Sequence, residues 1–190
     1  MQFCSMNEPC LILIDVQNGL DEYEYYGGRR NNLDAEENMS ILLHHWRQEK
    51  RHVIHVKHNS TAKDSPLRAG QSGNDIKESV FPLDSEMIFE KSVNSAFIGT
   101  DLEQVLKQQN IDKLVIIGLT TEHCVSTTTR TAGNLGFEVI LVSDATAAFD
   151  RKLNDGSVIR AEDVHRTELA LLDREFCKVM TTKDVIDGNF

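Results

Sequence analysis

Six short runs of apolar residues recur along the chain and predict β-strands. Most of them are apolar at every position instead of alternating with polar residues, which is typical of strands that are buried on both faces. The runs fall at 11–14, 53–56, 87–89, 114–117, 139–142 and 176–180.

Segments with helical periodicity lie between these runs. Met39, Leu42, Leu43 and Trp46 follow the i, i+3, i+4, i+7 spacing of a helix with one buried face. Shorter patterns of the same kind occur in three further segments, 102–106, 125–132 and 164–172. Because strands that alternate with helices form β-α-β units, we predict an α/β fold with a parallel sheet covered on both sides.

Two long segments, 19–32 and 59–83, show neither pattern and are predicted to be loops. All three tyrosines of the chain, Tyr23, Tyr25 and Tyr26, fall in the first of them. Loops of this length inside a compact domain are often lids or binding segments. The first segment is therefore either a solvated surface loop or an aromatic cover over a pocket, and both interpretations stay open.

Composition and charge narrow the possible roles. The 190 residues suit a single domain over 1–190. With 20 Lys and Arg against 30 Asp and Glu, the formal net charge is −10, which argues against nucleic acid and anionic membranes as partners because both attract positive charge. The chain has no apolar run long enough to span a bilayer and no signal-peptide pattern at its start, so we predict a cytoplasmic protein.

The four cysteines, Cys4, Cys10, Cys124 and Cys177, are widely spaced and include no Cys-x-x-Cys pair. This spacing predicts free thiols, and it favours neither a disulfide framework nor a zinc knuckle. Cys10 and Cys177 lie in or beside predicted strands, where a cysteine usually acts as a small buried apolar residue.

Three residues with chemical capability follow predicted strands. Asp15 follows the first run, Lys91 follows the third, and Cys124 enters the helix after the fourth. Each of them alone has an ordinary structural explanation. In a parallel sheet, however, the carboxyl ends of the strands meet at one edge, where ligands bind. The sequence therefore predicts a carboxylate, an ammonium and a thiol at the same edge.

The charges of these residues suggest how they interact. Asp15 and Lys91 are expected to pair, because a charge stranded beside a core costs several kcal/mol. A thiol beside Lys91 at a helix N-terminus has the setting that lowers a cysteine pKa, although Glu122 would oppose this unless it faces solvent. The turn at 118–125 leads into a helix, whose first backbone N–H groups can form an oxyanion hole.

Three motifs, at 14–19, 90–97 and 118–125, resemble those of the isochorismatase-like cysteine hydrolase superfamily, which includes nicotinamidases and N-carbamoylsarcosine amidohydrolases. The resemblance covers about residues 9–180. It implies a three-layer α-β-α sandwich with a six-stranded, mostly parallel sheet. It also implies a homo-oligomer, a dimer or tetramer, that acts on a small-molecule substrate.

The same resemblance assigns a catalytic triad of Asp15, Lys91 and Cys124. It implies a cis peptide bond between Leu119 and Thr120, which would turn the Thr120 amide toward an oxyanion beside the amide of Cys124. Four further side chains are candidates for substrate binding, with packing or surface exposure as their alternative role: Gln17, Tyr23, His58 and Phe97.

The metal site of nicotinamidases is not repeated in this chain. Those enzymes hold a metal through an aspartate and histidines after the second strand, whereas 56–60 has one histidine and no acid. We therefore expect neither a metal nor another cofactor. His52, His55 and His58 are close in sequence, but on a strand His55 faces away from the other two, which favours scattered surface or edge histidines.

The presence of Cys124 also indicates the type of substrate. Enzymes that hydrolyse isochorismate cleave a vinyl ether without a nucleophilic cysteine, so we expect an amide or related acyl C–N bond, cleaved through a thioester on Cys124. The alternatives are a non-catalytic or redox-sensing member, an isochorismatase-type vinyl ether hydrolase, and metal-assisted hydrolysis. A redox sensor commonly has a resolving cysteine close by, and the expected position of Cys10 and Cys177 inside the sheet favours the enzyme.

Overall fold

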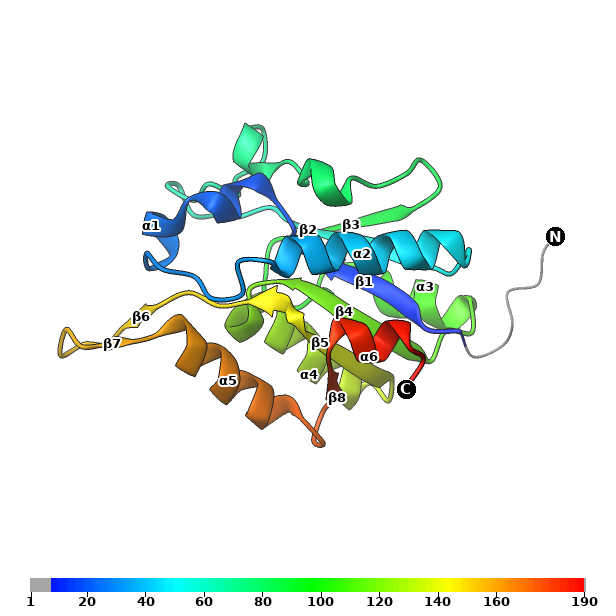
Figure 1. The fold of residues 1–190 in the computed structure, drawn as a ribbon. Helices are drawn as coiled ribbons and strands as arrows, with labels where there is room; N and C mark the ends of the chain where they lie inside the picture. The colour runs from blue at the N-terminus through cyan, green and yellow to red at the C-terminus, as the bar shows by residue number, and fades with distance from the viewer. Residues whose placement is uncertain (1–7, 190) are drawn as a thin grey trace.

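The computed structural model describes residues 8–189. Its centre is a six-stranded sheet in the order β3-β2-β1-β4-β5-β8, in which every neighbouring pair is parallel. Helices cover both faces, so the fold is the expected three-layer α-β-α sandwich (Figure 1). The strands are β1 (Cys10–Ile14), β2 (Val53–His58), β3 (Met87–Lys91), β4 (Lys113–Leu119), β5 (Glu138–Ala147) and β8 (Lys178–Met180).

All six predicted strands are confirmed, with changes at their ends. β1 is buried at every position because it lies between β2 and β4 in the middle of the sheet. β5 continues beyond the predicted run as far as Ala147, and its register with β4 shifts between Ile116 and Gly118. This irregularity lies directly before the turn that carries Cys124.

Two apolar clusters hold the helices against the sheet. The predicted apolar face of α2, which includes Met39 and Trp46, packs with Leu11 and Leu13 of β1 in one cluster. Ile12 belongs to the other cluster, because side chains alternate between the two faces along a strand. α2 and α6 cover one face, and α3, α4 and α5 cover the other (Figure 1).

The helices carry most of the connections between strands. They are α1 (Tyr23–Tyr26), α2 (Ala35–Gln48), α3 (Leu102–Gln108), α4 (Ser126–Asn134), α5 (Ala161–Leu172) and α6 (Thr182–Ile186). A π-helical turn at Thr121–Val125 precedes α4. Within α2, Trp46 is fully buried, and its indole Nε1 donates a hydrogen bond to the carbonyl of Pro9 at 2.9 Å.

Short turns of helix interrupt both segments that are predicted to be loops. The first contains α1 after a 3₁₀ turn at Asn18–Asp21, and the second contains 3₁₀ turns at Ser72–Asn74 and Glu78–Val80. An antiparallel hairpin of β6 (Arg151–Lys152) and β7 (Val158–Ile159) escapes prediction because each strand has only two residues. Figure 1 shows α1 and this hairpin beyond the carboxyl ends of the central strands.

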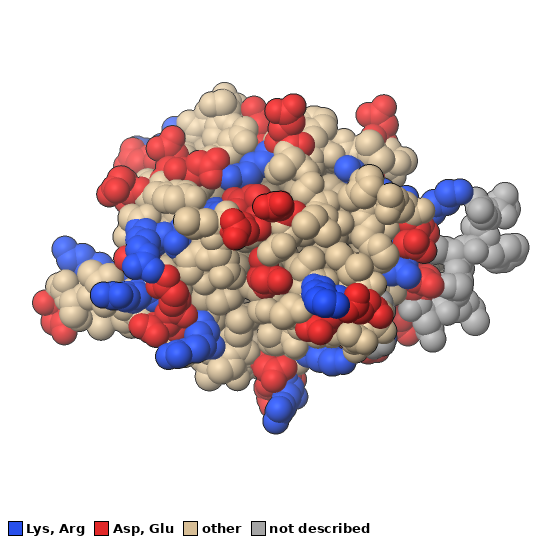
Figure 2. Space-filling view, in the orientation of Figure 1, with Lys and Arg blue, Asp and Glu red and all other residues tan. Residues whose placement is uncertain are grey.

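Charged side chains of both signs are interspersed over the face drawn in Figure 2. Within residues 8–189, no helix is long and apolar enough to cross a membrane. Cys10, Cys124 and Cys177 are free and buried, whereas Cys4 lies outside the described residues.

Candidate active site

The structure brings Asp15, Lys91 and Cys124 together at the carboxyl edge of the sheet. Asp15 directly follows β1, Lys91 ends β3, and Cys124 lies in the π-helical turn after β4. Lys91 Nζ donates a hydrogen bond to Asp15 Oδ2 at 2.7 Å, and both residues are at least 97% buried, with 3% and 2% of their surface exposed. One side-chain atom each of Asp15, Cys124 and His58 lie within 4.8 Å of one another.

The backbone of Asp15 is strained. Its φ angle is 51°, in the left-handed region that residues other than glycine rarely adopt. Its N–H donates to the carbonyl of Val56 at 2.9 Å, and its carbonyl accepts from the N–H of Gln17 at 2.9 Å. Strained residues of this kind cluster at functional sites.

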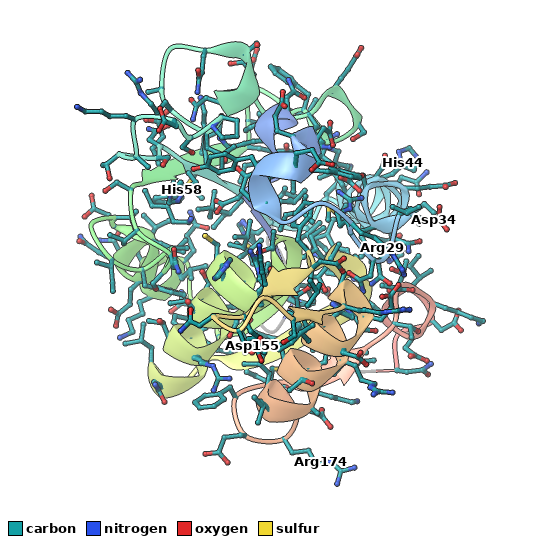
Figure 3. All side chains as sticks on the ribbon, turned by 90° about the vertical axis from the view of Figure 1, so that its left-hand side faces the viewer. Arg29, Asp34, His44, His58, Asp155 and Arg174 are labelled. Atoms are coloured by element: carbon teal, nitrogen blue, oxygen red, sulfur yellow. The ribbon has the colours of Figure 1, made fainter. Side chains whose placement is uncertain are left out.

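His58 ends β2 at the carboxyl edge that faces the viewer in Figure 3. Its Nδ1 lies 3.1 Å from Lys91 Nζ. Because an ammonium group has no lone pair, the ring nitrogen is the acceptor. Burial and the positive charge of Lys91 lower the pKa of His58, so the ring is neutral near pH 7. The Lys91 ammonium thus donates hydrogen bonds to two side chains, Asp15 and His58.

The thiol of Cys124 is protonated in this environment. Burial and then the negative charge of Asp15 raise its pKa, and the charge of Lys91 opposes them only in part. The prediction of a lowered thiol pKa is therefore wrong, because Lys91 is paired with Asp15 and the thiol is removed from water. A base is needed to form the thiolate, and Asp15 is the carboxylate within reach.

The turn between β4 and Cys124 contains both predicted oxyanion-hole residues. The peptide bond between Leu119 and Thr120 is cis. The Thr120 carbonyl accepts hydrogen bonds from the N–H groups of His123 at 3.1 Å and Val125 at 3.3 Å, which closes the turn. Thr120 and Cys124 both line the cavity described below, so their amides are candidate donors to an oxyanion there.

Glu122, whose direction the sequence leaves open, points into the protein. Its side chain is 8% exposed and forms an ion pair with Arg151, which begins β6. Arg151 also donates to the carbonyl of Tyr26 at 3.1 Å. The charge of Glu122 is thus neutralised by a residue from the hairpin that no sequence pattern predicts.

A cavity of about 300 Å³ opens over the cluster. Its walls come from α1, from the loop after β2 and from the turn after β4. The residues that line it are Asp15, Leu20, Tyr25, Tyr26, His58, Ser60, Ser65, Leu67, Asn94, Leu119, Thr120, His123 and Cys124. A space of this size suits a small molecule.

The tyrosines of α1 divide between two roles. Tyr25 and Tyr26 line the cavity, which supports the interpretation of this segment as an aromatic cover. Tyr23, the tyrosine chosen as a substrate-binding candidate, lies elsewhere: its ring meets the edge of Phe149 at 5.6 Å and lies beneath the guanidinium of Arg30 at 5.5 Å.

Gln17 holds the loop after β2 and lies outside the cavity lining. It is fully buried. Its amide nitrogen donates to the carbonyls of His58 at 3.1 Å and Asn74 at 2.8 Å, and its amide oxygen accepts from the N–H of His58 at 2.8 Å. Gln17 therefore positions His58.

Phe97 is also placed away from the cavity, where its ring stacks on Phe137 with the centroids 5.8 Å apart. From the same motif, Asn94 faces the cavity, and its Oδ1 lies 3.9 Å from the thiol sulfur of Cys124. The sequence contained a signal for Asn94, since the 90–97 motif includes it, but periodicity does not show which member of a turn faces a ligand.

The donor set Asp15, His58 and Cys124 is compact enough to resemble a metal site. The Lys91 ammonium, however, already donates to Asp15 and His58, so this set does not fit a cation while Lys91 is in place. His55, expected at a surface or edge, is in fact buried. Its Nε2 lies 2.9 Å from Glu86 Oε2, which supplies the partner that a buried imidazole needs.

A doubly covered parallel sheet with a carboxylate, an ammonium and a thiol at its carboxyl edge defines an α/β protein with a candidate active site where such sheets bind ligands. The family can be named more closely. The model of the isochorismatase domain family matches residues 9–184, and the chain belongs to this family of hydrolases.

Individual relatives agree with this assignment. The chain is 46% identical over 180 residues to the uncharacterised isochorismatase family protein YrdC of Bacillus subtilis, covering 95% of both chains. An isochorismatase-family structure from Chromobacterium violaceum is 38% identical with a TM-score of 0.91, covering 100% of this chain and 98% of the other. A cysteine hydrolase from Pseudomonas syringae is 26% identical with a TM-score of 0.85, covering 94% and 91%.

Proposed function

We propose that this protein is a cysteine hydrolase that cleaves an amide or related acyl C–N bond of a small molecule through a thioester on Cys124. The observation that carries the proposal is the buried cluster of Asp15, Lys91 and Cys124 beneath a cavity of about 300 Å³. Asp15, Lys91 and Cys124 form the catalytic triad in this proposal.

The first half-reaction forms the thioester. Asp15 accepts the proton of the Cys124 thiol, and the thiolate attacks the carbonyl carbon of the substrate. The amides of Thr120 and Cys124 donate hydrogen bonds to the oxyanion of the tetrahedral intermediate. Asp15 then returns its proton to the leaving nitrogen as the C–N bond breaks, which leaves an acyl group on sulfur and releases an amine or ammonia.

The second half-reaction hydrolyses the thioester. Asp15 accepts a proton from a water molecule, whose oxygen attacks the acyl carbon. The C–S bond breaks, the proton returns to the Cys124 sulfur, and the carboxylic acid product leaves. Lys91 orients Asp15 through the 2.7 Å hydrogen bond, and His58 Nδ1 accepts a second hydrogen bond from the same ammonium.

The redox-sensing alternative is less well supported. The Cys10 thiol donates to the carbonyl of Leu11 in β1, and the Cys177 thiol donates to the carbonyl of Leu172. Both are buried structural thiols with pKa values raised by burial, whereas a resolving cysteine must be accessible. The vinyl ether hydrolase alternative leaves Cys124 without a role.

Acyl-enzyme trapping tests the proposal. Wild-type protein, Cys124→Ala and the matched thiol deletion Cys177→Ala are screened against nicotinamide, N-carbamoyl amino acids, ureidoacrylate-like compounds and lactams. We expect Cys124→Ala to lose roughly 10³-fold or more in kcat/KM and Cys177→Ala to keep most activity. Mass spectrometry of quenched wild-type enzyme should show the acyl mass on Cys124. Equal turnover of a substrate by wild type and Cys124→Ala would contradict the nucleophile assignment.

A further inference from the structure

The cavity carries almost no formal charge. Among the described residues that line it, Asp15 is the only Asp, Glu, Lys or Arg. Lys91 lies beneath it and is paired with Asp15, and Arg151 is paired with Glu122. The positive groups nearest the cluster are therefore already neutralised by the protein.

A hollow beside the cavity is lined by charged side chains of both signs. It shares Tyr25 and Ser65 with the cavity, and Lys63 lines it together with Glu22 and Asp64. A substrate carboxylate would therefore find no unbalanced positive side chain in the cavity and would lie near the carboxylate of Asp15. A buried anion without a partner is strongly disfavoured.

Two residues that line the cavity have hydrogen-bonding groups that the protein leaves unpaired. The hydroxyl of Tyr26 and the Oγ1 of Thr120 are buried and have no hydrogen-bond partner among the described residues. Both residues line the cavity. The Tyr26 ring is fixed, because it stacks on Phe149 at 5.2 Å and meets the edge of Tyr25 at 4.9 Å. This packing holds the hydroxyl in a fixed, buried position.

The hydroxyl of Tyr26 also stays protonated and can donate a hydrogen bond. Burial and nearby negative charge, including that of Asp15, raise the pKa of its hydroxyl, so it keeps its proton. Buried polar groups in proteins are almost always satisfied, and an unpaired one in a binding site indicates the group that a ligand supplies.

We propose that the substrate is a small, uncharged carboxamide or lactam with a second polar acceptor beyond the scissile carbonyl, which the Tyr26 hydroxyl and Thr120 Oγ1 bind. The inference rests on the proposed cysteine-hydrolase function and defines its substrate class. It excludes carboxylate substrates, such as N-carbamoyl amino acids, from efficient turnover.

Two activated esters that share the same benzoyl skeleton, one neutral and one anionic, test whether the cavity prefers an uncharged acyl group. The test does not require knowledge of the natural substrate. The neutral probe is p-nitrophenyl 4-methoxycarbonylbenzoate, and the anionic probe is p-nitrophenyl 4-carboxybenzoate. Acylation rates of wild type and Cys124→Ala are followed by nitrophenolate release, and the acyl mass on Cys124 is checked by mass spectrometry. Each rate is divided by the rate with free N-acetylcysteine, which removes the intrinsic reactivity of the ester.

We expect the corrected rate of the neutral probe to exceed that of the anionic probe by at least about 10-fold. Equal rates, or a faster anionic probe, would overturn the inference while leaving the nucleophile intact. If neither probe places an acyl group on Cys124, the cysteine-hydrolase function itself fails, and the inference fails with it.

The role of Tyr26 is tested with Tyr26→Phe and the matched control Tyr23→Phe, which removes the same hydroxyl from the same helix outside the cavity lining. Acylation by the neutral probe should fall about 10-fold in Tyr26→Phe only. Acylation by unsubstituted p-nitrophenyl benzoate, which lacks the second acceptor, should stay the same in all three proteins. An equal loss with both esters would mean that Tyr26 is structural and would overturn its assignment.

Discussion

Lys91 illustrates how much one side chain determines at the residue scale. Its ammonium donates to Asp15 Oδ2 at 2.7 Å and to His58 Nδ1 at 3.1 Å, and it is almost completely buried. The Asp15 partner was predictable, because strand order in a parallel sheet brings both residues to one edge. The hydrogen bond to His58 was not predictable, because it depends on the orientation of the last side chain of β2.

Replacing Lys91 by Met tests this arrangement. The variant keeps a side chain of similar length but leaves the Asp15 carboxylate buried and unpaired, so we expect the free energy of unfolding to fall by about 3 kcal/mol or more. Acylation of Cys124 should fall roughly 100-fold, since the base loses its orientation. Urea denaturation and acylation kinetics measure the two effects.

The control is Lys57→Met, which removes the same charge from a half-buried position of the neighbouring strand β2. It should change stability by less than about 1 kcal/mol and leave acylation near the wild-type rate. A Lys91→Met protein as stable as Lys57→Met would show that the buried ion pair does not form.

At the scale of single elements, the end of β4 decides where Cys124 lies. Gly118 has a φ angle of 126°, and a Cβ placed there would lie 2.1 Å from the carbonyl oxygen of Ile14. Gly118 is the direct partner of Ile14 in the parallel register of β1 and β4, and the register of β4 with β5 shifts between Ile116 and Gly118. Only glycine permits both the left-handed backbone and the contact.

Gly118→Ala should therefore destabilise the protein by more than about 3 kcal/mol, because the backbone strain and the clash add to each other. Gly136→Ala is the matched control: its φ angle is also positive, at 88°, but a Cβ there meets nothing within 4 Å. It should cost only about 1 to 2 kcal/mol. If the two variants unfold at the same urea concentration, the close contact between β4 and β1 is wrong.

The elements that were predictable and those that were not differ in length and pattern. The apolar runs were predictable because strands buried on both faces are apolar at nearly every position, and the α2 face was predictable because burial of one helix face imposes a period of 3.6. The β6–β7 hairpin has only two residues in each strand, so it carries no such signal. Arg151 of this hairpin, which neutralises Glu122, therefore escaped prediction with it.

For the whole molecule, stability should depend on pH through its histidines. Burial is the main cause that lowers the pKa values of His55, His58 and His165 below the ordinary value of 6.5. Below about pH 6.5 the unfolded chain binds protons at these sites that the folded protein does not, so the free energy of unfolding falls as pH decreases. Above pH 6.5 these three residues contribute no pH dependence.

Urea denaturation between pH 7.5 and 5 should show this loss, which we expect to reach about 1 to 2 kcal/mol. Glu36 and Glu86, whose pKa values are lowered from 4.5, contribute stability that is lost only in a more acidic pH range than this one. His165→Gln should reduce the slope, whereas His44→Gln, on the exposed side of α2, should not. Constant or rising stability as pH decreases would contradict the neutral state of the buried histidines.

The sequence by itself determined the α/β architecture, the strands, and the arrival of Asp15, Lys91 and Cys124 at one edge. The apolar patterns that mark strands and helices are local to the sequence, and strands that run parallel must bring their carboxyl ends to one edge of the sheet. Tertiary structure decided the rest: the second partner of Lys91, the raised pKa of Cys124, and the choice of Tyr26 over Tyr23 for the cavity. These depend on contacts such as the one between Asp15 and Lys91, which are 76 residues apart, and on how completely each group is removed from water.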